Sequence, residues 1–292
     1  MLLSVLQAFS QKLYLSSKIY ITPELVALFK TNWSLLVTSN HDCNFALPFY
    51  HLTSDKFWFL QAKPGFESFL QIKTSMRSFS NLNAAVDYAF VEDDLFKLIT
   101  NEKDNVVLLL FLLDEYFPET KNNFANSIPD QQKLLNNLEN KILKEDAVEY
   151  RTEIRKLIQQ KDEEEIFLRG SLFKREIPKI YNNTCCISGM RIDSTINVSM
   201  IDACHIVPFS ESYADTISNG IALCPNLHRA FDRGLISIGD NYEVIVKDTF
   251  SEELSTNYFI LPFHGKQINL PNKIEDFPSS ENLSYHRKKF NF

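Results

Sequence analysis

Two stretches in the last third of the chain decide the fold, namely DACHIVP at residues 202–208 and NGIALCPNLHRAFDRG at residues 219–234. Residues 199–206 and 219–224 are two short β-prone runs, and residues 225–233 are typical of a helix. The stretches therefore predict a strand, a loop, a second strand and a helix, with several polar residues placed at the ends of these elements.

The polar residues fit the hydrolysis of a phosphodiester, which needs a base to activate water and a cation to neutralise charge on the phosphate. His205 stands at the end of the first predicted strand before Ile-x-Pro, a position that suits a rigidly held general base. Asn219 opens the second strand, where its amide can bond across the hairpin and hold either the His205 ring or its loop. His228 and Asp232 are four residues apart on one face of the predicted helix and can ligate one cation.

This pattern resembles the HNH endonuclease superfamily, in particular the branch with the signature A-x-H-I-x-P followed by N-G-I-x-L-C-x-x-x-H-x-x-F-D-x-G. The similarity runs from about Phe173 to the C-terminus. The resemblance implies a ββα-metal nuclease domain that cuts DNA, with His205 as the general base and Asn219 as the middle residue of the motif. It also implies that His228 is a metal ligand and that Asp232 occupies the position of the second helix ligand.

Two departures from the superfamily bear on the metal. Many members place an acidic residue or a histidine directly before the base, where this chain has Cys204. Asp202 points to the same side by strand alternation, so the sequence leaves open whether Asp202 or Cys204 contributes to the metal site. The C-x-x-C pairs that bind a structural zinc in many relatives are broken here, so we expect no structural zinc. We expect Mg²⁺ or Mn²⁺ at the site, with Zn²⁺ or Ni²⁺ as alternatives because imidazole is a ligand.

Each of these residues also has an ordinary structural interpretation. A lone histidine such as His205 is more often a core residue, and His228 with Asp232 is more often a pair on a helix surface. Together with Asn219 and the Ile-x-Pro context, the set favours a nuclease. The alternatives are an inactive module and, from a different functional class, a non-catalytic DNA-binding protein with an HNH fold.

The chain as a whole predicts an α+β fold with three regions. Residues 1–124 form a mostly helical α+β recognition domain, residues 125–170 a linker and a charged helix, and residues 171–292 the nuclease domain. The charged segment is a solvated connecting helix by default, and a dimer-forming helix is the alternative.

Within the first region we predict a short strand at residues 19–21, followed by a helix that starts at Thr22-Pro23, because proline suits the first helical turn. Two strands are predicted between Phe45 and Leu60, joined near Ser54. The predicted helices of this region are 82–88, 93–100 and 106–116, the last of them buried.

The stretch ALPFYHLTSDKFWFL at residues 46–60 resembles the sulfur-recognising domain of phosphorothioate-dependent McrA-type restriction enzymes, which has a similar P-F-x-x-L-x-x-D-G-F-W stretch. The resemblance implies an apolar pocket around Pro48 that receives the sulfur of a modified DNA backbone, with Leu47, Tyr50 and His51 as neighbours. Sulfur is larger and more weakly hydrated than oxygen, so an apolar pocket penalises the normal phosphate. An ordinary buried hairpin is the alternative.

Composition sets the remaining expectations. The net charge of −7 is weak evidence against DNA binding, since clustered Lys and Arg usually make the phosphate contacts, but it does not exclude a local basic surface. No secretory leader or membrane span is expected, and five cysteines fit reduced thiols in a cytoplasm.

The sequence thus predicts a cytoplasmic, Type IV-like restriction endonuclease that acts in antiviral defence on phosphorothioate-modified DNA. A homodimer would supply the two sites that cutting of a duplex needs. The alternatives for targeting are another DNA modification or a defence-system signal.

Overall fold

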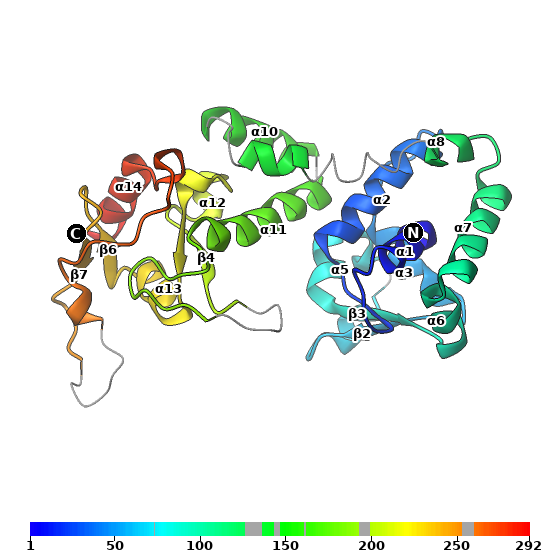
Figure 1. Cartoon of the computed structure of the whole chain (residues 1–292), viewed down its shortest axis with the longest axis horizontal. Coiled ribbons are helices and arrows are strands. Elements are labelled where there is room, and N and C mark those ends of the chain that lie inside the picture. The colour runs from blue at the N-terminus through cyan, green and yellow to red at the C-terminus, as the bar shows by residue number, and fades with distance from the viewer. Residues whose placement is uncertain (73, 126–135, 143–146, 161, 193–198, 253–259) are drawn as a thin grey trace. The chain divides into compact units, whose positions relative to one another are not determined.

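The computed structural model describes residues 1–72, 74–125, 136–142, 147–160, 162–192, 199–252 and 260–292 (Figure 1). Its contacts divide the chain into two compact units, unit 1 (Met1–Leu138 and Lys161–Leu168) and unit 2 (Glu139–Gln160 and Arg169–Phe292). Both units combine helices with small antiparallel sheets, which confirms the predicted α+β class. Among the described residues, no helix is long and apolar enough to cross a membrane.

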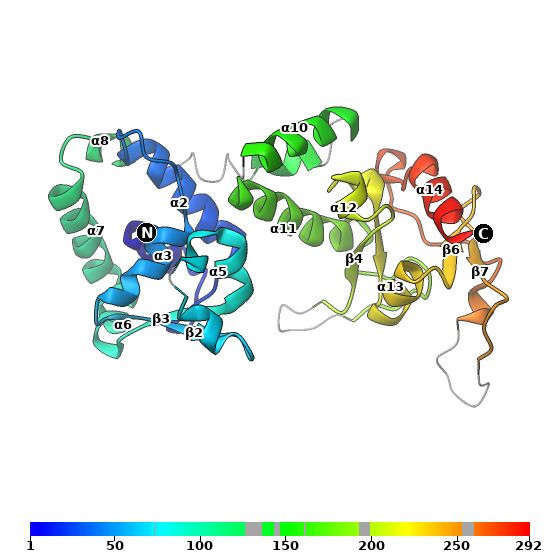
Figure 2. The ribbon, with the colours of Figure 1, turned by 180° about the vertical axis from the view of Figure 1, so that it is seen from behind.

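Unit 1 is built from helices around one three-stranded antiparallel sheet of order β1-β3-β2. Its strands are β1 (Lys18–Ile19), β2 (Trp58–Ala62) and β3 (Val86–Val91). Its helices are α1 (Leu2–Ser10), α2 (Pro23–Leu36), α3 (Ala46–His51), α4 (Glu67–Leu70), α5 (Phe79–Ala85), α6 (Asp93–Thr100), α7 (Glu102–Tyr116) and α8 (Lys121–Ala125). Figure 1 and Figure 2 both place α7 at one edge of this unit.

Aromatic side chains join α3 to the sheet of unit 1. The buried indole of Trp58 on β2 donates a hydrogen bond from Nε1 to the carbonyl oxygen of Phe49 at 3.0 Å. Phe45 and Phe49 are fully buried and their rings stack at 5.2 Å. Residues four apart lie on the same face of a helix, so a helical α3 turns both rings into the core.

The structure corrects the prediction of two strands between Phe45 and Leu60. In place of the first strand it has α3, then a 3₁₀ turn (Leu52–Ser54), and only one strand, β2. The aromatic residues that indicated a strand are spaced for one face of a helix. Pro48 is tolerated in the helix because the N–H groups of the first turn have no partner within it.

Most other predicted boundaries of unit 1 agree with the structure. Helix α2 begins at Pro23, and the hydroxyl of Thr22 accepts a backbone hydrogen bond of its first turn at 3.3 Å. The predicted strand near residue 19 is β1, and the helix predicted at 93–100 is α6. The helix predicted at 82–88 is only partly confirmed, because α5 ends at Ala85 and residues 86–88 belong to β3, a strand that the sequence did not predict. The β-branched Val86 opens this strand.

The helix predicted at 106–116 exists as α7, but the prediction that it is buried was wrong. Asn105 and Leu113 face the core, whereas Phe111 is 59% exposed and Val107 is 64% exposed. An uninterrupted apolar run has no polar face to mark the solvent side, so the sequence does not show which side is covered. Only the packing of α7 on α1 and α6 decides it.

The charged segment is helical as predicted, but it is divided. Residues 136–142 are helical, α10 covers Ala147–Gln160, and α11 covers Glu163–Ile180. The segment is also not wholly solvated, because Tyr150 and Arg169 are fully buried and the Arg169 guanidinium lies 3.0 Å from the Glu153 carboxylate. Residues 126–135 of the predicted linker lie outside the described part of the chain.

Unit 2 contains the predicted hairpin and helix. Its strands are β4 (Asp202–His205), β5 (Gly220–Leu223), β6 (Ile236–Ile238) and β7 (Val244–Val246), paired as β4-β5 and β6-β7. Its remaining helices are α12 (Phe209–Ser212), α13 (Pro225–Asp232) and α14 (Ser280–Phe290). The strand, loop, strand, helix order expected from the sequence is confirmed.

The close packing of α11 on the hairpin positions the site. In the β4-β5 register His205 lies opposite Gly220. A Cβ atom at Gly220 would lie 2.3 Å from the Ile177 side chain, so only glycine lets α11 approach the strand this closely. This approach brings the side chains of α11 against the end of β4.

Candidate active site

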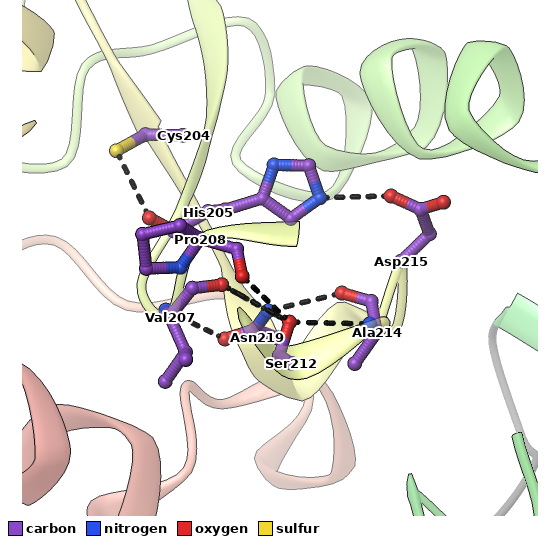
Figure 3. A network of polar contacts seen from close by, with 8 residues as sticks. All are labelled: Cys204, His205, Val207, Pro208, Ser212, Ala214, Asp215 and Asn219. Atoms are coloured by element: carbon purple, nitrogen blue, oxygen red, sulfur yellow. Dashed lines mark hydrogen bonds and ion pairs between the residues drawn. The ribbon is translucent and has the colours of Figure 1, made fainter. Parts of the chain in front are cut away.

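His205 is held in one orientation at the end of β4. Its ring stacks on Phe173 of α11, with ring centroids 4.0 Å apart and an interplanar angle of 12°. Its Nε2 lies 2.8 Å from Oδ1 of Asp215 (Figure 3). A carboxylate beside Nε2 favours the tautomer in which Nε2 carries the proton and donates it in this hydrogen bond. Nδ1 is then left as the basic nitrogen, which is the arrangement that a general base requires.

Asp215 is a residue of the site that the sequence did not reveal. It lies in the loop between β4 and β5, and its side chain is only 3% exposed. The loop belongs to no regular pattern, so spacing could not single out this carboxylate among the other acidic residues of the chain. Its burial beside His205 suits a group that orients the imidazole and stabilises its protonated form.

Asn219 holds the loop that carries Asp215. Its Oδ1 accepts a hydrogen bond from the Val207 N–H at 2.9 Å, and its Nδ2 donates to the carbonyl oxygens of Val207 and Ala214, each at 2.9 Å (Figure 3). The amide is 1% exposed. Of the two arrangements expected from the sequence, Asn219 thus contacts the loop and not the His205 ring.

The predicted metal ligands meet between β4 and α13. His228 of α13 lies between two carboxylates, with Nδ1 3.2 Å from Asp202 Oδ2 and Nε2 3.4 Å from Asp232 Oδ2. The Cys204 Sγ lies 3.9 Å from Asp232 Oδ1. One ligand atom each of Cys204, His228 and Asp232 fall within 4.8 Å of one another. Of the two residues that the sequence left open, Cys204 belongs to this group, whereas Asp202 faces the other ring nitrogen of His228.

The donor set fits a hard divalent cation better than a soft one. Burial, helped by the negative charge of Asp232 and Asp202, raises the pKa of the Cys204 thiol well above its usual value. Sulfur is also a soft donor, which hard cations bind less readily than oxygen. The remaining donors are two carboxylates and an imidazole, and the carboxylates of Asp202 and Asp232 are 47% and 57% exposed. Oxygen-rich donors open to solvent suit Mg²⁺ or Mn²⁺, which retain water ligands.

The comparison with protein families agrees with this geometry. A family model described as HNH endonuclease matches residues 185–239, which include β4, β5, α13 and β6. These residues form an HNH endonuclease domain. The HNH domain thus contains His205, Asn219, His228 and Asp232, together with Asp215.

Two further comparisons concern the whole chain. No curated protein matches the sequence. A solved structure titled "Modification dependent TagI restriction endonuclease" is similar over 41% of this chain and 38% of its own, with 19% sequence identity and a TM-score of 0.30. The similarity therefore spans well under half of that protein.

The residues predicted for a sulfur pocket lie on α3 of unit 1, and the structure brings only two of the four together. Pro48 and His51 line a cavity of about 530 Å³, which we call the unit 1 cavity. Leu47 and Tyr50 do not line it, and the Tyr50 hydroxyl donates to the Leu70 carbonyl oxygen at 3.0 Å. Residues three apart share a helix face, which explains why Pro48 and His51 meet.

Proposed function

We propose that this chain is a metal-dependent DNA endonuclease that cuts modified DNA. The observation that carries the proposal is the pairing of His205 with the buried Asp215, on the same hairpin that brings Asp202 and Asp232 around His228. A fixed base and a donor set for a cation would then lie on adjoining elements of one small motif.

His205 and Asp215 divide the work of activating water. The Nδ1 atom of His205 takes a proton from a water molecule, while the Phe173 ring and Asp215 hold the imidazole in place. The Asp215 carboxylate then stabilises the protonated imidazole. Asn219 acts on this pair through the loop and does not contact the reacting atoms.

Asp202, His228 and Asp232 would hold the divalent cation. When bound, such a cation neutralises negative charge that develops on the phosphate during hydrolysis. We assign Cys204 to the packing between β4 and α13 and not to the ligand set, because its side chain is fully buried and hard divalent cations prefer oxygen donors to sulfur.

Unit 1 would supply the target, as in a Type IV-like restriction enzyme. Pro48 and His51 of the sulfur-domain resemblance lie together on the wall of an apolar cavity, which supports phosphorothioate as the first modification to test. An apolar surface favours the weakly hydrated sulfur over a normal phosphate oxygen. Another DNA modification or a defence-system signal is the alternative, and we place the activity in a cytoplasm, with a homodimer for double-strand cutting.

Cleavage of matched plasmids tests both halves of the proposal. Plasmid DNA with and without phosphorothioate is incubated with the full chain in Mg²⁺ or Mn²⁺, beside His205→Ala. We expect cutting of the modified plasmid alone, and no cutting by the variant. Cutting of both plasmids keeps the nuclease and removes the sulfur hypothesis. Binding without any cutting, unchanged in His205→Ala, favours a non-catalytic DNA-binding protein.

A further inference from the structure

We propose that the unit 1 cavity takes a single unpaired nucleobase of the target DNA, swung out of the duplex. This inference rests on the proposed role of unit 1 in reading DNA. It specifies that unit 1 binds the base of a nucleotide, which neither the HNH domain nor the sulfur hypothesis states.

The size and walls of the cavity fit a flat, apolar-faced group. A volume of about 530 Å³ lies within the range of small-molecule sites and exceeds what one sulfur atom would fill. Helices α2 and α7 contribute the aromatic residues Phe29, Trp33 and Tyr116. Enzymes that extrude a base from DNA bind it between aromatic and apolar side chains, because every base has a π-face that stacks.

Within the described part of the chain, the interior of the cavity offers no cationic side chain that could bind a phosphate. Among the described residues, no Lys or Arg lines the cavity. Met1 lines it, and burial lowers the pKa of its α-amino group to about 5, so this amine is neutral at pH 7. The ionisable side chains of the lining are those of His51, Asp55 and Tyr116, and all three are exposed, so they form the rim. A neutral base can enter such a cavity while its phosphate stays at the rim.

The wall also contains an unmet hydrogen-bonding group. Asn32 lines the cavity and is 5% exposed. Its Nδ2 donates to the Ser4 hydroxyl at 3.0 Å and to Gln7 Oε1 at 2.7 Å, but its Oδ1 has no partner among the described residues. A buried acceptor without a partner is costly. Because Oδ1 is closed to solvent, the ring N–H or amino group of a base would reach it only after the Asn32 side chain turns toward the cavity.

Base insertion and sulfur recognition can act on one nucleotide. His51 at the rim and Pro48 beside it on α3 are where the backbone next to an inserted base would lie. A sulfur atom would then contact the rim while the base fills the interior. The two contacts make different predictions for DNA in which one base is already unpaired.

The test compares binding of two duplexes. One contains an orphan base, which is a base without a partner in the opposite strand, and the other is fully paired. Orphan cytosine and orphan adenine duplexes are used, each with and without a phosphorothioate linkage beside the orphan base. The full chain is kept in EDTA to prevent cutting, and the dissociation constant is measured by fluorescence anisotropy at fixed salt. An orphan base needs no unpairing, so wild-type protein should bind at least one orphan duplex about tenfold or more tightly than its paired partner.

Two variants change the cavity, and a third serves as control. Leu52→Trp fills the cavity and Trp33→Ala removes an aromatic wall, while Phe59→Ala removes an exposed aromatic of β2 that does not line it. We expect both cavity variants to lose the orphan-base preference and Phe59→Ala to keep it. Thermal unfolding of each variant checks the fold, and either cavity variant suffices if the other unfolds.

The outcomes separate the inference from the proposed function. Equal binding of orphan and paired duplexes by wild-type protein, or a preference that survives in both cavity variants, overturns base insertion and leaves the nuclease untouched. A lack of binding to every duplex overturns the DNA-reading role of unit 1, and base insertion with it. Tighter binding that depends on the phosphorothioate alone keeps the sulfur contact and overturns insertion.

Discussion

In unit 2, the polar residues of the HNH site come from β4, the loop between β4 and β5, and α13, which follow one another between Asp202 and Asp232. In unit 1, the walls of the cavity come from α1, α2, α3 and α7, which other elements separate along the chain. A site made within one hairpin and helix leaves a spacing signature in the sequence. A site made by packing distant helices leaves none, and its energy is shared among many side chains.

This difference predicts that single substitutions at the catalytic pair of unit 2 lower the cleavage rate by more than any single substitution in the unit 1 cavity changes DNA binding. The largest effect is expected for His205→Ala. Loss of the general base should lower the cleavage rate by roughly 10²- to 10⁴-fold with DNA binding retained. Single-turnover cleavage and anisotropy measure the two quantities. His41→Ala, an exposed histidine of unit 1, is the control, and a similar loss there would contradict the assignment.

Asn219→Ala tests how strongly unit 2 depends on one side chain. The buried amide makes hydrogen bonds to Val207 and Ala214, and their removal leaves polar backbone groups unpaired. We expect a loss of about 3 kcal/mol in the free energy of unfolding, measured by urea denaturation. Asn226→Ala on the exposed face of α13 should change it by less than about 0.5 kcal/mol. Equal losses of unfolding free energy in Asn219→Ala and Asn226→Ala would show that the hydrogen bonds of Asn219 do not hold the loop.

Asp215→Asn keeps the shape of the buried side chain but removes its charge. The protonated His205 ring loses its partner, so we expect the maximal cleavage rate to fall on the order of 10²-fold, with DNA affinity unchanged. A rate equal to that of the unchanged protein would show that the imidazole needs no carboxylate. A parallel loss of affinity would instead indicate a damaged loop.

The metal site gives a comparison within unit 2. Asp232→Asn should raise the Mg²⁺ or Mn²⁺ concentration for half-maximal cleavage by roughly tenfold or more, because a charged ligand is lost. Cys204→Ala should leave that concentration within about threefold, because the side chain is fully buried and a hard cation prefers oxygen donors to sulfur. Removal of the cation with EDTA should stop cleavage. An equal shift for Cys204→Ala would place sulfur in the ligand set.

The smallest effect is expected in the unit 1 cavity. Pro48→Ala removes part of one apolar wall that many residues share, so discrimination between modified and unmodified DNA should fall by about fivefold, near 1 kcal/mol. Binding of matched duplexes with and without phosphorothioate measures this ratio. A complete loss of discrimination would make Pro48 a single dominant contact and weaken the contrast between the two units.

The accuracy of the sequence predictions follows the same division. The hairpin, α13 and the pairing of His228 with Asp232 were predictable, because they depend on local strand patterns and on the four-residue repeat of a helix, whereas the choice between Asp202 and Cys204 stayed open. Asp215 was not predictable, because a loop has no periodic pattern. Its side chain meets His205 in a loop that Asn219 holds through a hydrogen bond to Ala214.

In unit 1 the errors came from burial. Phe45 and Phe49 were read as strand residues, yet their rings pack on Trp58 and on each other as a helix face. Helix α7 was correctly predicted as a helix but wrongly as buried, because its apolar run carries no mark of the side that α1 and α6 cover.

The sequence by itself thus determined the α+β class, the HNH hairpin and helix, and most of its polar residues, because neighbouring residues and short-range hydrogen bonds specify them. The tertiary structure decided the Asp215 partner, the stacking of Phe173 on His205, and the unit 1 cavity. These features depend on which distant surfaces pack together, and the free energy of that packing is shared by residues that no local spacing connects.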